Sequence, residues 1–317
     1  MPRYILYRLP LTILVLFGVS ILTFAIVRLA PGDPSALLVD PTQLTREEQV
    51  AVRRELGLED PLPVQYVRTV TALAAGELRS FRTRRPTVEM VLEAAPSTLL
   101  LVGSAVTIGV TIGVAMGAVA ALRPYSRLDD AVSVLALFGL SVPSFWLGLM
   151  LIYVFAENLH WLPASGLRPS GSDTWNPLVV GPHLLMPTLV LASGMVAAVA
   201  RYTRSSMLEA LRSDYVRTAR AKGLRESQVV VRHALRNSLI TVVTLVGVLV
   251  PILLSGSVVV ESVFGIPGMG RLAVSAALAR DYPVVMTTTM VAAALVVLSS
   301  LVTDLGYTLV DPRIRLG

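Results

Sequence analysis

Six long apolar stretches constrain this chain more than any other feature. They lie at residues 9–30, 98–122, 131–156, 177–200, 238–260 and 283–303. A helix needs about 20 apolar residues to cross the hydrocarbon core of a bilayer, so each stretch is long enough to span a membrane. Only 15% of the 317 residues are charged, whereas soluble domains have about 25%. The sequence therefore predicts an all-α membrane protein with six transmembrane helices.

The first stretch has one alternative interpretation. Arg3 and Arg8 precede it, as basic residues precede the apolar region of a secretory signal peptide. The apolar run is longer than such a region, and Ala30-Pro31 provides no cleavage site of small residues. We therefore interpret residues 1–30 as an N-terminal transmembrane helix.

The distribution of Lys and Arg predicts the orientation. The link 201–237 contains nine of these residues and the link 123–130 contains two, but the link 157–176 contains only one. Short cytoplasmic loops carry the excess of positive charge. Since six spans place both termini on the same side as the two basic links, we expect both termini to be cytoplasmic. The arginine-rich link 31–96 is then external, and long links cross largely regardless of charge.

The external link 31–96 contains signals of ordered structure. Thr45 and Glu48 have the spacing of a capping box at the start of a helix that runs to residue 56. A second helix is predicted at residues 64–75, after a turn stiffened by prolines. We predict three parts: the helix 1–30, a small external helical element at 31–96, and a five-helix core at 97–310 with a cytoplasmic segment at 201–238.

Glycine and proline mark the interiors of the spans. Three glycines spaced four residues apart predict a close helix contact, with a helix of this chain or of a partner: Gly109, Gly113 and Gly117. Three prolines predict kinks, which suit a moving pore but are also common in membrane helices: Pro143, Pro187 and Pro251.

The residues that most enzymes need are missing. The three histidines lie in different segments and lack metal-ligand spacing, and the chain contains no cysteine. A P-loop requires Lys followed by Ser or Thr, but Gly223 follows Lys222, the only lysine. This chain therefore has no ATPase site of that type. The spans are almost free of ionisable residues, which gives little support to ion coupling, although a passive pore remains an alternative.

The link 201–237 has the pattern of a compact projecting structure. A short helix is predicted at 215–222, Gly223 ends it, and a second helix is predicted at 227–235. Such a structure can dock on a soluble partner, whereas the alternative is a basic loop that only follows the positive-inside rule. We select these candidate docking residues: Tyr215, Arg217, Thr218, Ala219, Lys222, Gly223, Leu224, His233, Arg236 and Asn237.

A second constellation lies between the last two spans. Gly and Pro are so dense in 261–271 that turns are predicted there in place of a helix. The segment can cap the mouth of a pore or re-enter the membrane, or it can be an ordinary loop. The candidate gate residues are Glu261, Phe264, Pro267, Gly268, Gly270, Arg271, Asp281 and Tyr282.

Both constellations resemble the permeases of ATP-binding-cassette importers. The first is similar to their E-A-A-x3-G-x9-I-x-L-P loop, with matches at Ala219, Gly223 and Leu235 and departures at the other fixed positions. The second is similar to E-x-x-F-x-x-P-G-x-G followed by R-D-Y-P. Further similar strings occur at 29–34, 55–66, 141–148 and 161–166, so the resemblance to B-type permeases of dipeptide, oligopeptide and nickel importers covers essentially the whole chain. One departure lies at residues 76–80, where this chain has G-E-L-R-S and the family tends to have G-D-L-G-x-S, and the following run 81–85 is unusually basic.

The resemblance implies a transport subunit of the bacterial cytoplasmic membrane and no enzyme. It implies a second permease subunit, two cytoplasmic ATPase subunits that hold ATP and Mg²⁺, and an external substrate-binding protein. It implies no cofactor in this chain and no nucleic-acid partner; membrane lipid surrounds it. The segment 217–223 would transmit movement from the ATPases. The substrate would be a peptide, with nickel complexes or oligosaccharides as alternatives.

Overall fold

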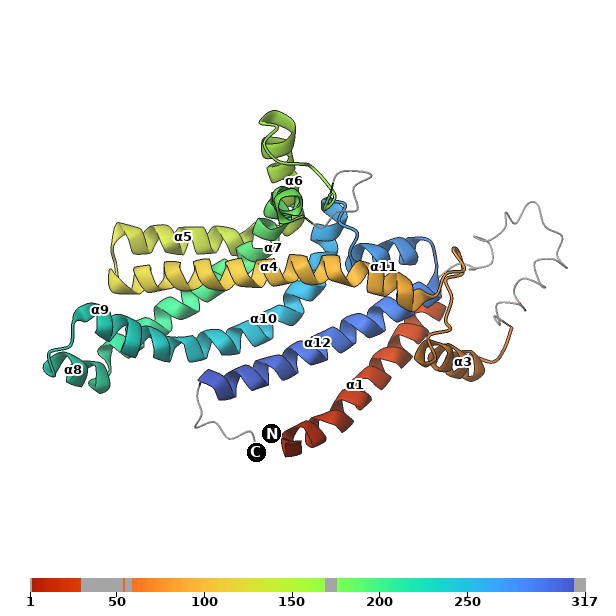
Figure 1. Ribbon diagram of the computed structural model, residues 1–317, viewed down its shortest axis with the longest axis horizontal. Coiled ribbons are helices and arrows are strands. Elements are labelled where there is room, and N and C mark those ends of the chain that lie inside the picture. Colours follow the sequence, from red (N-terminus) through yellow and green to blue (C-terminus); the bar gives the residue numbers. More distant parts are fainter. Residues whose placement is uncertain (1, 30–53, 55–58, 169–175, 311–317) are drawn as a thin grey trace. The chain divides into compact units, whose positions relative to one another are not determined.

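The computed structural model describes residues 2–29, 54, 59–168 and 176–310 (Figure 1). In these ranges the chain is helical, apart from turns and an isolated bridge between Arg79 and Pro86. The elements are α1 Pro2–Leu29, α3 Leu62–Ala74, α4 Thr87–Leu122, α5 Arg127–Ser141, α6 Ser144–Leu151, η2 Ile152–Asn158, α7 Pro177–Arg212, α8 Asp214–Ala221, α9 Glu226–Gln228, η3 Val229–Leu235, α10 Arg236–Val263, α11 Met269–Leu278 and α12 Tyr282–Val310.

The described helices agree with the predicted spans. Five are long and apolar enough to cross a membrane, and the count is six if the bent pair of Arg127–Ser141 and Ser144–Asn158 is one span. That pair bends by 103° at Pro143, whose ring cannot continue a helix. Pro187 and Pro251 lie within α7 and α10 without ending them. Of the three predicted kinks, the one at Pro143 is therefore a true break.

The chain forms two compact units. Unit 1 contains residues Met1–Thr98 and Pro267–Val297, and unit 2 contains Leu99–Ile266 and Leu298–Gly317. The unit that holds the N-terminal helix thus also holds a late segment of the chain. The predicted external helix at 64–75 is present as α3 Leu62–Ala74, whereas the predicted helix at 45–56 lies outside the described residues, apart from Arg54.

Helix α7 is the centre of unit 2, and small residues let its neighbours approach closely. A Cβ atom at Gly109 would lie 2.8 Å from the Met195 side chain, and one at Gly113 would lie 2.7 Å from Val199 Cβ. A Cβ atom at Gly117 would contact the Ala200 carbonyl oxygen even more closely. The predicted glycine ridge on α4 therefore packs against α7 of the same chain.

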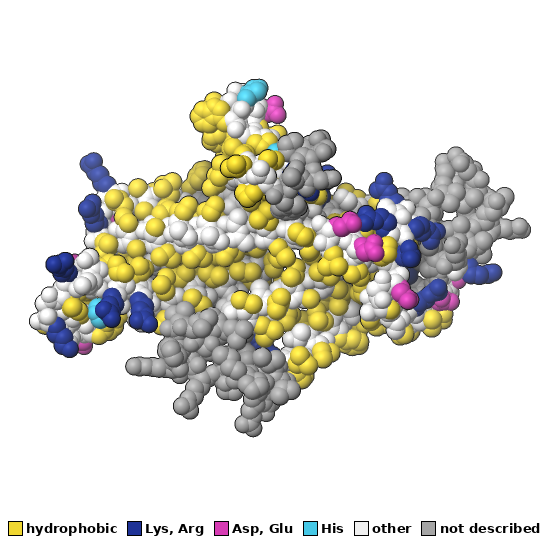
Figure 2. Space-filling model, viewed as in Figure 1, with side chains coloured by type: hydrophobic (Ala, Val, Ile, Leu, Met, Phe, Trp, Pro, Cys, Tyr) yellow, Lys and Arg dark blue, Asp and Glu magenta, His cyan; other side chains and the backbone are white. Residues whose placement is uncertain are grey.

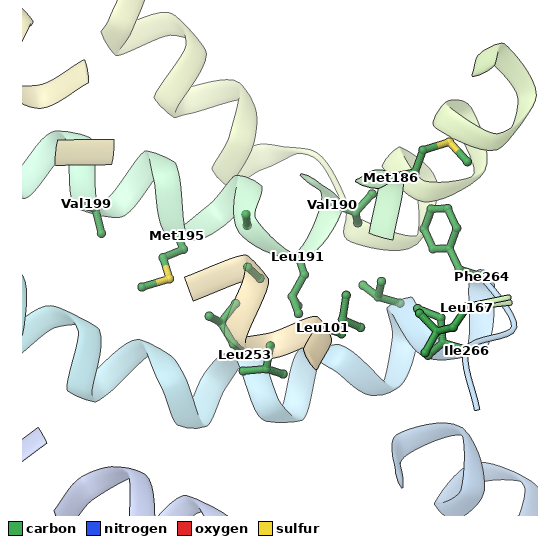
Figure 3. Close-up of a cluster of buried hydrophobic side chains, with 14 of the residues drawn as sticks. Leu101, Leu167, Met186, Val190, Leu191, Met195, Val199, Leu253, Phe264 and Ile266 are labelled. Carbon is green, nitrogen blue, oxygen red and sulfur yellow. The ribbon is translucent and has the colours of Figure 1, made fainter. Parts of the chain in front are cut away.

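The largest apolar cluster of unit 2 surrounds the middle of α7. Met186, Val190, Leu191, Met195 and Val199 point from α7 toward residues of the neighbouring segments (Figure 3). The partners that Figure 3 labels include Leu101 of α4, Leu253 of α10, and Leu167, Phe264 and Ile266 of the connecting turns. The apolar side chains of α7 thus fix the bundle on which the other segments are mounted.

Unit 1 is held by polar contacts at the start of α12. Asp281 is buried and accepts hydrogen bonds from Ser80 Oγ at 2.5 Å and from the Phe81 amide at 3.0 Å. Thr87 and Thr287 share a hydrogen bond of 2.7 Å between their hydroxyls. These bonds join the 80–87 segment to α12, two regions about 200 positions apart in the sequence.

We expect Gly113→Ala to destabilise the protein by about 1–3 kcal/mol, because its methyl group overpacks the contact with Val199 and with the Val196 carbonyl. Gly103→Ala is the matched control, since nothing lies within 4 Å of its added Cβ on the same helix. The control should be neutral or slightly stabilising, as Ala favours helix over Gly. Thermal unfolding of the two variants in the same detergent tests this. Equal melting temperatures would contradict the packing assignment.

Candidate functional site

The predicted docking segment begins with the short helix α8 Asp214–Ala221. At its end the Gly223 amide donates to the Arg220 carbonyl at 2.9 Å, and the Leu224 amide donates to the Ala219 carbonyl at 3.4 Å. This pair of bonds is a Schellman motif, which needs a left-handed residue after the helix. Gly223 supplies that residue with a φ of +78°. The prediction that Gly223 ends a short helix is confirmed.

An apolar contact holds α8 against the returning chain. Val216 and Ala219 of α8 pack with Val229 at the start of η3, and all three side chains are buried. One turn later, Ala234 of η3 packs with Met207 and Ala210 at the end of α7. The projection formed by α8, Gly223 and α9 therefore has a small apolar core with Val229, and Ala234 anchors it on α7, the central helix of unit 2.

Polar contacts close the same projection from outside. The Arg220 guanidinium donates two hydrogen bonds to the Glu226 carboxylate, at 2.6 and 3.1 Å. This charged hydrogen bonding raises the pKa of Arg220 above its usual range. Asn237 Nδ2 donates to the Tyr215 hydroxyl at 3.1 Å. The predicted site residues Tyr215 and Asn237 thus meet, although 22 positions separate them.

The remaining predicted residues of this segment differ in exposure. Ala219 is buried, His233 is half-buried, and these are exposed: Arg217, Thr218, Lys222, Gly223, Leu224 and Arg236. Figure 2 shows Lys and Arg side chains gathered at the α8 end of unit 2. The predicted second helix at 227–235 is present but is not separate, because α9 and the π-helical η3 continue directly into α10.

The two basic links lie at the same end of unit 2, as the orientation argument requires. Asp129 in the first turn of α5 accepts two hydrogen bonds from the Arg204 guanidinium of α7, at 2.6 and 2.7 Å. The Asp129 side chain is 4% exposed and that of Arg204 is 28% exposed. Sequence reasoning missed this pair. Asp129 follows Ser126 at a helix-start spacing, but nothing in one sequence links it to Arg204.

The residues predicted as an external gate belong to both units. In unit 2, Glu261 and Phe264 are buried at the end of α10. The Phe264 carbonyl accepts a hydrogen bond from the Gly166 amide at 2.8 Å, and the Phe264 ring would lie 3.1 Å from a Cβ at Gly148. Phe264 therefore fixes the turn after α10 to α6 and to the 162–167 segment.

The prediction of turns throughout 261–271 is wrong in part. Helix α10 of unit 2 continues to Val263, and a helix of unit 1 starts near the other end of this segment. The helix α11 Met269–Leu278 begins within it. Its first amide, at Met269, donates to Thr98 Oγ1 at 2.8 Å, which satisfies a donor that a helix start leaves free. Two further candidates, Gly268 and Gly270, are buried around this start, and Pro267 and Arg271 are exposed. The last pair, Asp281 and Tyr282, lies at the start of α12.

Sequence comparison places these features in a family. A family model described as "Binding-protein-dependent transport system inner membrane component" matches residues 109–316, and its N-terminal companion matches residues 1–102. The chain belongs to this family. It is a permease subunit of an ATP-binding-cassette importer in the cytoplasmic membrane.

Relatives of this permease match over their full length. It is 41% identical to the oligopeptide transport system permease protein AppB of Bacillus subtilis, over 99% of this chain and 100% of the relative. It is 40% identical to the di/tripeptide transport system permease protein DppB of Pseudomonas aeruginosa, over 99% of both chains. The resemblance found in the sequence motifs is therefore confirmed.

Solved structures show the same fold. An inward-facing form of the MetNI methionine ABC transporter matches with a TM-score of 0.56 and 20% identity, over 73% of this chain and 99% of that chain. An amino acid ABC transporter matches with a TM-score of 0.50 and 19% identity, over 72% and 95%. The permease is a transport subunit that associates with an ATPase and other importer components, and ATP hydrolysis belongs to the separate ATPase subunit.

We expect Asp129→Asn to destabilise the permease by about 3 kcal/mol, because the substitution leaves the Arg204 guanidinium without its charged partner. Asp130→Asn is the matched control, since Asp130 is an exposed neighbour in the same helical turn. Thermal unfolding and a double-mutant cycle with Arg204→Gln measure the coupling. Additive effects in the cycle would show that the pair contributes nothing.

Proposed function

We propose that this permease forms half of the pathway by which di- or oligopeptides enter the cell. The observation that carries the proposal is the full-length identity of about 40% with proteins named as peptide permeases. Similarity over 99% of the chain includes both the spans and their connections. Nickel complexes and oligosaccharides are the alternative substrates, and a passive or ion-coupled channel is the alternative mechanism.

The proposed complex contains this permease, a second permease subunit, two ATPase subunits with bound ATP and Mg²⁺, and an external substrate-binding protein. Both termini and the two basic links face the cytoplasm. The basic residues then satisfy the positive-inside rule, so they require no nucleic-acid partner. The co-location of the links 123–130 and 201–237, through the pair of Asp129 and Arg204, supports this orientation.

The projection formed by α8, Gly223 and α9 is the proposed contact with an ATPase. A part that transmits force must keep its shape, and this one has a buried core of Val216, Ala219 and Val229. It must also be joined firmly to the spans, and η3 continues without a break into α10. Closure of the ATPases would move the projection, and α7 and α10 would carry that movement into the bundle. Such coupling requires contacts that differ between the two states.

The substrate class is tested with the assembled importer in liposomes that contain ATP. We expect uptake of radiolabelled dipeptide or oligopeptide that depends on the substrate-binding protein and on ATP. Nickel and oligosaccharide uptake are measured in the same vesicles. Uptake without ATP, or with the ATPase subunits left out, would contradict the importer mechanism, and uptake of nickel or sugar alone would replace the peptide assignment.

Gly223→Pro should abolish uptake and uncouple ATP hydrolysis from substrate, while the chain still inserts into the membrane. Proline fixes φ near −65°, removes the amide that donates to Arg220 and cannot adopt the +78° of Gly223. Gly223→Asn is the matched control, because Asn tolerates the left-handed conformation and nothing lies within 4 Å of its Cβ. Wild-type uptake by the proline variant would refute the coupling role.

A further inference from the structure

The transport function does not explain how deep helix α3 lies relative to the apolar span of α1. This helix belongs to the element predicted to be external, yet Tyr66 reaches α1. Its hydroxyl lies 2.7 Å from Ser20 Oγ, and its ring packs edge-on against Phe17 and Phe24. Ser20 is near the middle of the 22-residue apolar span Arg8–Leu29, about 13 Å from its end at 1.5 Å per residue. A side chain of α3 thus extends into the depth of the bilayer.

The outer surface of α3 is suited to that depth. Leu62 and Val67 are each 58% exposed, and Val64 is 50% exposed. Exposed apolar side chains are favourable where lipid covers them, and a helix that lies in the membrane interface has this character. Arg68, one turn after Val64 on the same side of the helix, forms an ion pair with Asp60 at 3.6 Å, so its charge has a partner.

A basic turn adjoins α3 in unit 1. Thr69 of α3 and Phe81 of the turn line one small hollow of about 30 Å³, together with Phe24 of α1 and Tyr282 of α12. The turn 79–85 contains four exposed arginines. Phe81 therefore places this turn beside the ends of two spans, at the level where lipid headgroups are found, and the arginines flank Phe81 in the sequence.

The turn is built to hold its arginines in place. Asp281 fixes it from inside through Ser80 Oγ and the Phe81 amide. Arg84 has a φ of +58°, a conformation that a residue with a Cβ adopts only where its surroundings impose it. Arg79 donates to the Arg84 carbonyl at 3.0 Å, and Arg85 is paired with Glu93 at 2.5 Å. Within the described part of the chain, no carboxylate pairs with the guanidinium group of Arg82 or Arg84, whereas the Arg82 amide donates to Asp281 at 3.5 Å.

We propose that α3 and the turn 79–85 form a binding site for anionic phospholipid at the membrane surface. Val64 and Val67 on one side of α3 contact the acyl chains, and Arg82 and Arg84 bind the headgroup phosphate. Guanidinium groups form strong paired hydrogen bonds with phosphate oxygens, and clustered arginines next to a span attract anionic lipid. Lipid is favoured over a protein partner because Tyr66 places α3 within the bilayer. The site does not depend on what the permease transports.

The depth of α3 is tested with single labels, which the absence of cysteine makes straightforward. The assembled importer carries Val67→Cys or Leu22→Cys with a nitroxide label, in nanodiscs of phosphatidylcholine and phosphatidylglycerol. Leu22 is 63% exposed on α1 and provides the lipid reference. We expect the Val67 label to collide with oxygen more often than with a water-soluble nickel chelate. Preference for the chelate would place α3 in water and overturn the proposal.

Headgroup preference is tested with a fluorophore at Thr83→Cys and lipids that carry a quenching nitroxide. At equal mole fraction, labelled phosphatidylglycerol should quench about tenfold more effectively than labelled phosphatidylcholine. The double variant Arg82→Gln/Arg84→Gln should bring this ratio close to one. The matched control Arg123→Gln/Arg127→Gln removes the same charge from exposed positions elsewhere and should leave the ratio unchanged.

Four outcomes would overturn the lipid assignment. Equal quenching by the two lipids in the wild-type importer would show that the turn does not select anionic headgroups. Loss of the preference in the control double variant would show an effect of total charge only. Displacement of labelled phosphatidylglycerol by millimolar inorganic phosphate would assign the turn to free phosphate instead. Protection of the Thr83 label by the substrate-binding protein, without any lipid preference, would assign the turn to that protein.

Discussion

The close approach of helices to α7 supports the rest of unit 2. In lipid there is little hydrophobic drive between helices, so they associate where small residues allow van der Waals contact. Gly109, Gly113 and Gly117 bring α4 onto Met195, Val199 and Ala200, and Gly139 brings α5 onto the Ser193 carbonyl. Because these contacts leave no room for a Cβ atom, α4 and α5 have one defined position against α7. The ends of all three helices are then fixed as well.

The end of α7 that these contacts fix also supports the projection formed by α8, Gly223 and α9. Met207 and Ala210 lie in the last turns of α7, and they form the surface on which Ala234 packs. Asp129 and Arg204 join α5 to α7 near the same end. Movement applied to α8 therefore reaches three elements at once: α7 through the chain and η3, α10 through the unbroken helix, and α5 through the ion pair. A loop that was merely basic would have none of these connections.

The sequence was sufficient for features that depend on neighbouring residues. Gly223 followed a short helical pattern, and its left-handed conformation and Schellman bonds follow from local chemistry. The apolar stretches likewise predicted the spans, since bilayer thickness sets their length. The break at Pro143 was anticipated as a kink, but its angle of 103° was not. Proline shows where a helix can end, whereas the packing of α5 and α6 decides how far the chain then turns.

The features that the sequence could not predict involve distant partners. Asp281 was selected from a motif, yet its contact with Ser80 lies 201 positions away. The turns predicted in 261–271 omitted α11, because Gly and Pro density describes Phe264 to Gly268 well and says nothing of the apolar residues that follow.

The position of α3 in the membrane is a further feature that the sequence could not predict. The helix at 64–75 was predicted from local pattern, and its external side followed from the number of spans and the distribution of Lys and Arg. The contact of Tyr66 with Ser20 brings α3 against the middle of the apolar span of α1. A segment can lie on the outer side of a span and still be solvated by lipid. Depth in the membrane is therefore set by which side chain meets which part of a span, and not by the order of segments along the chain.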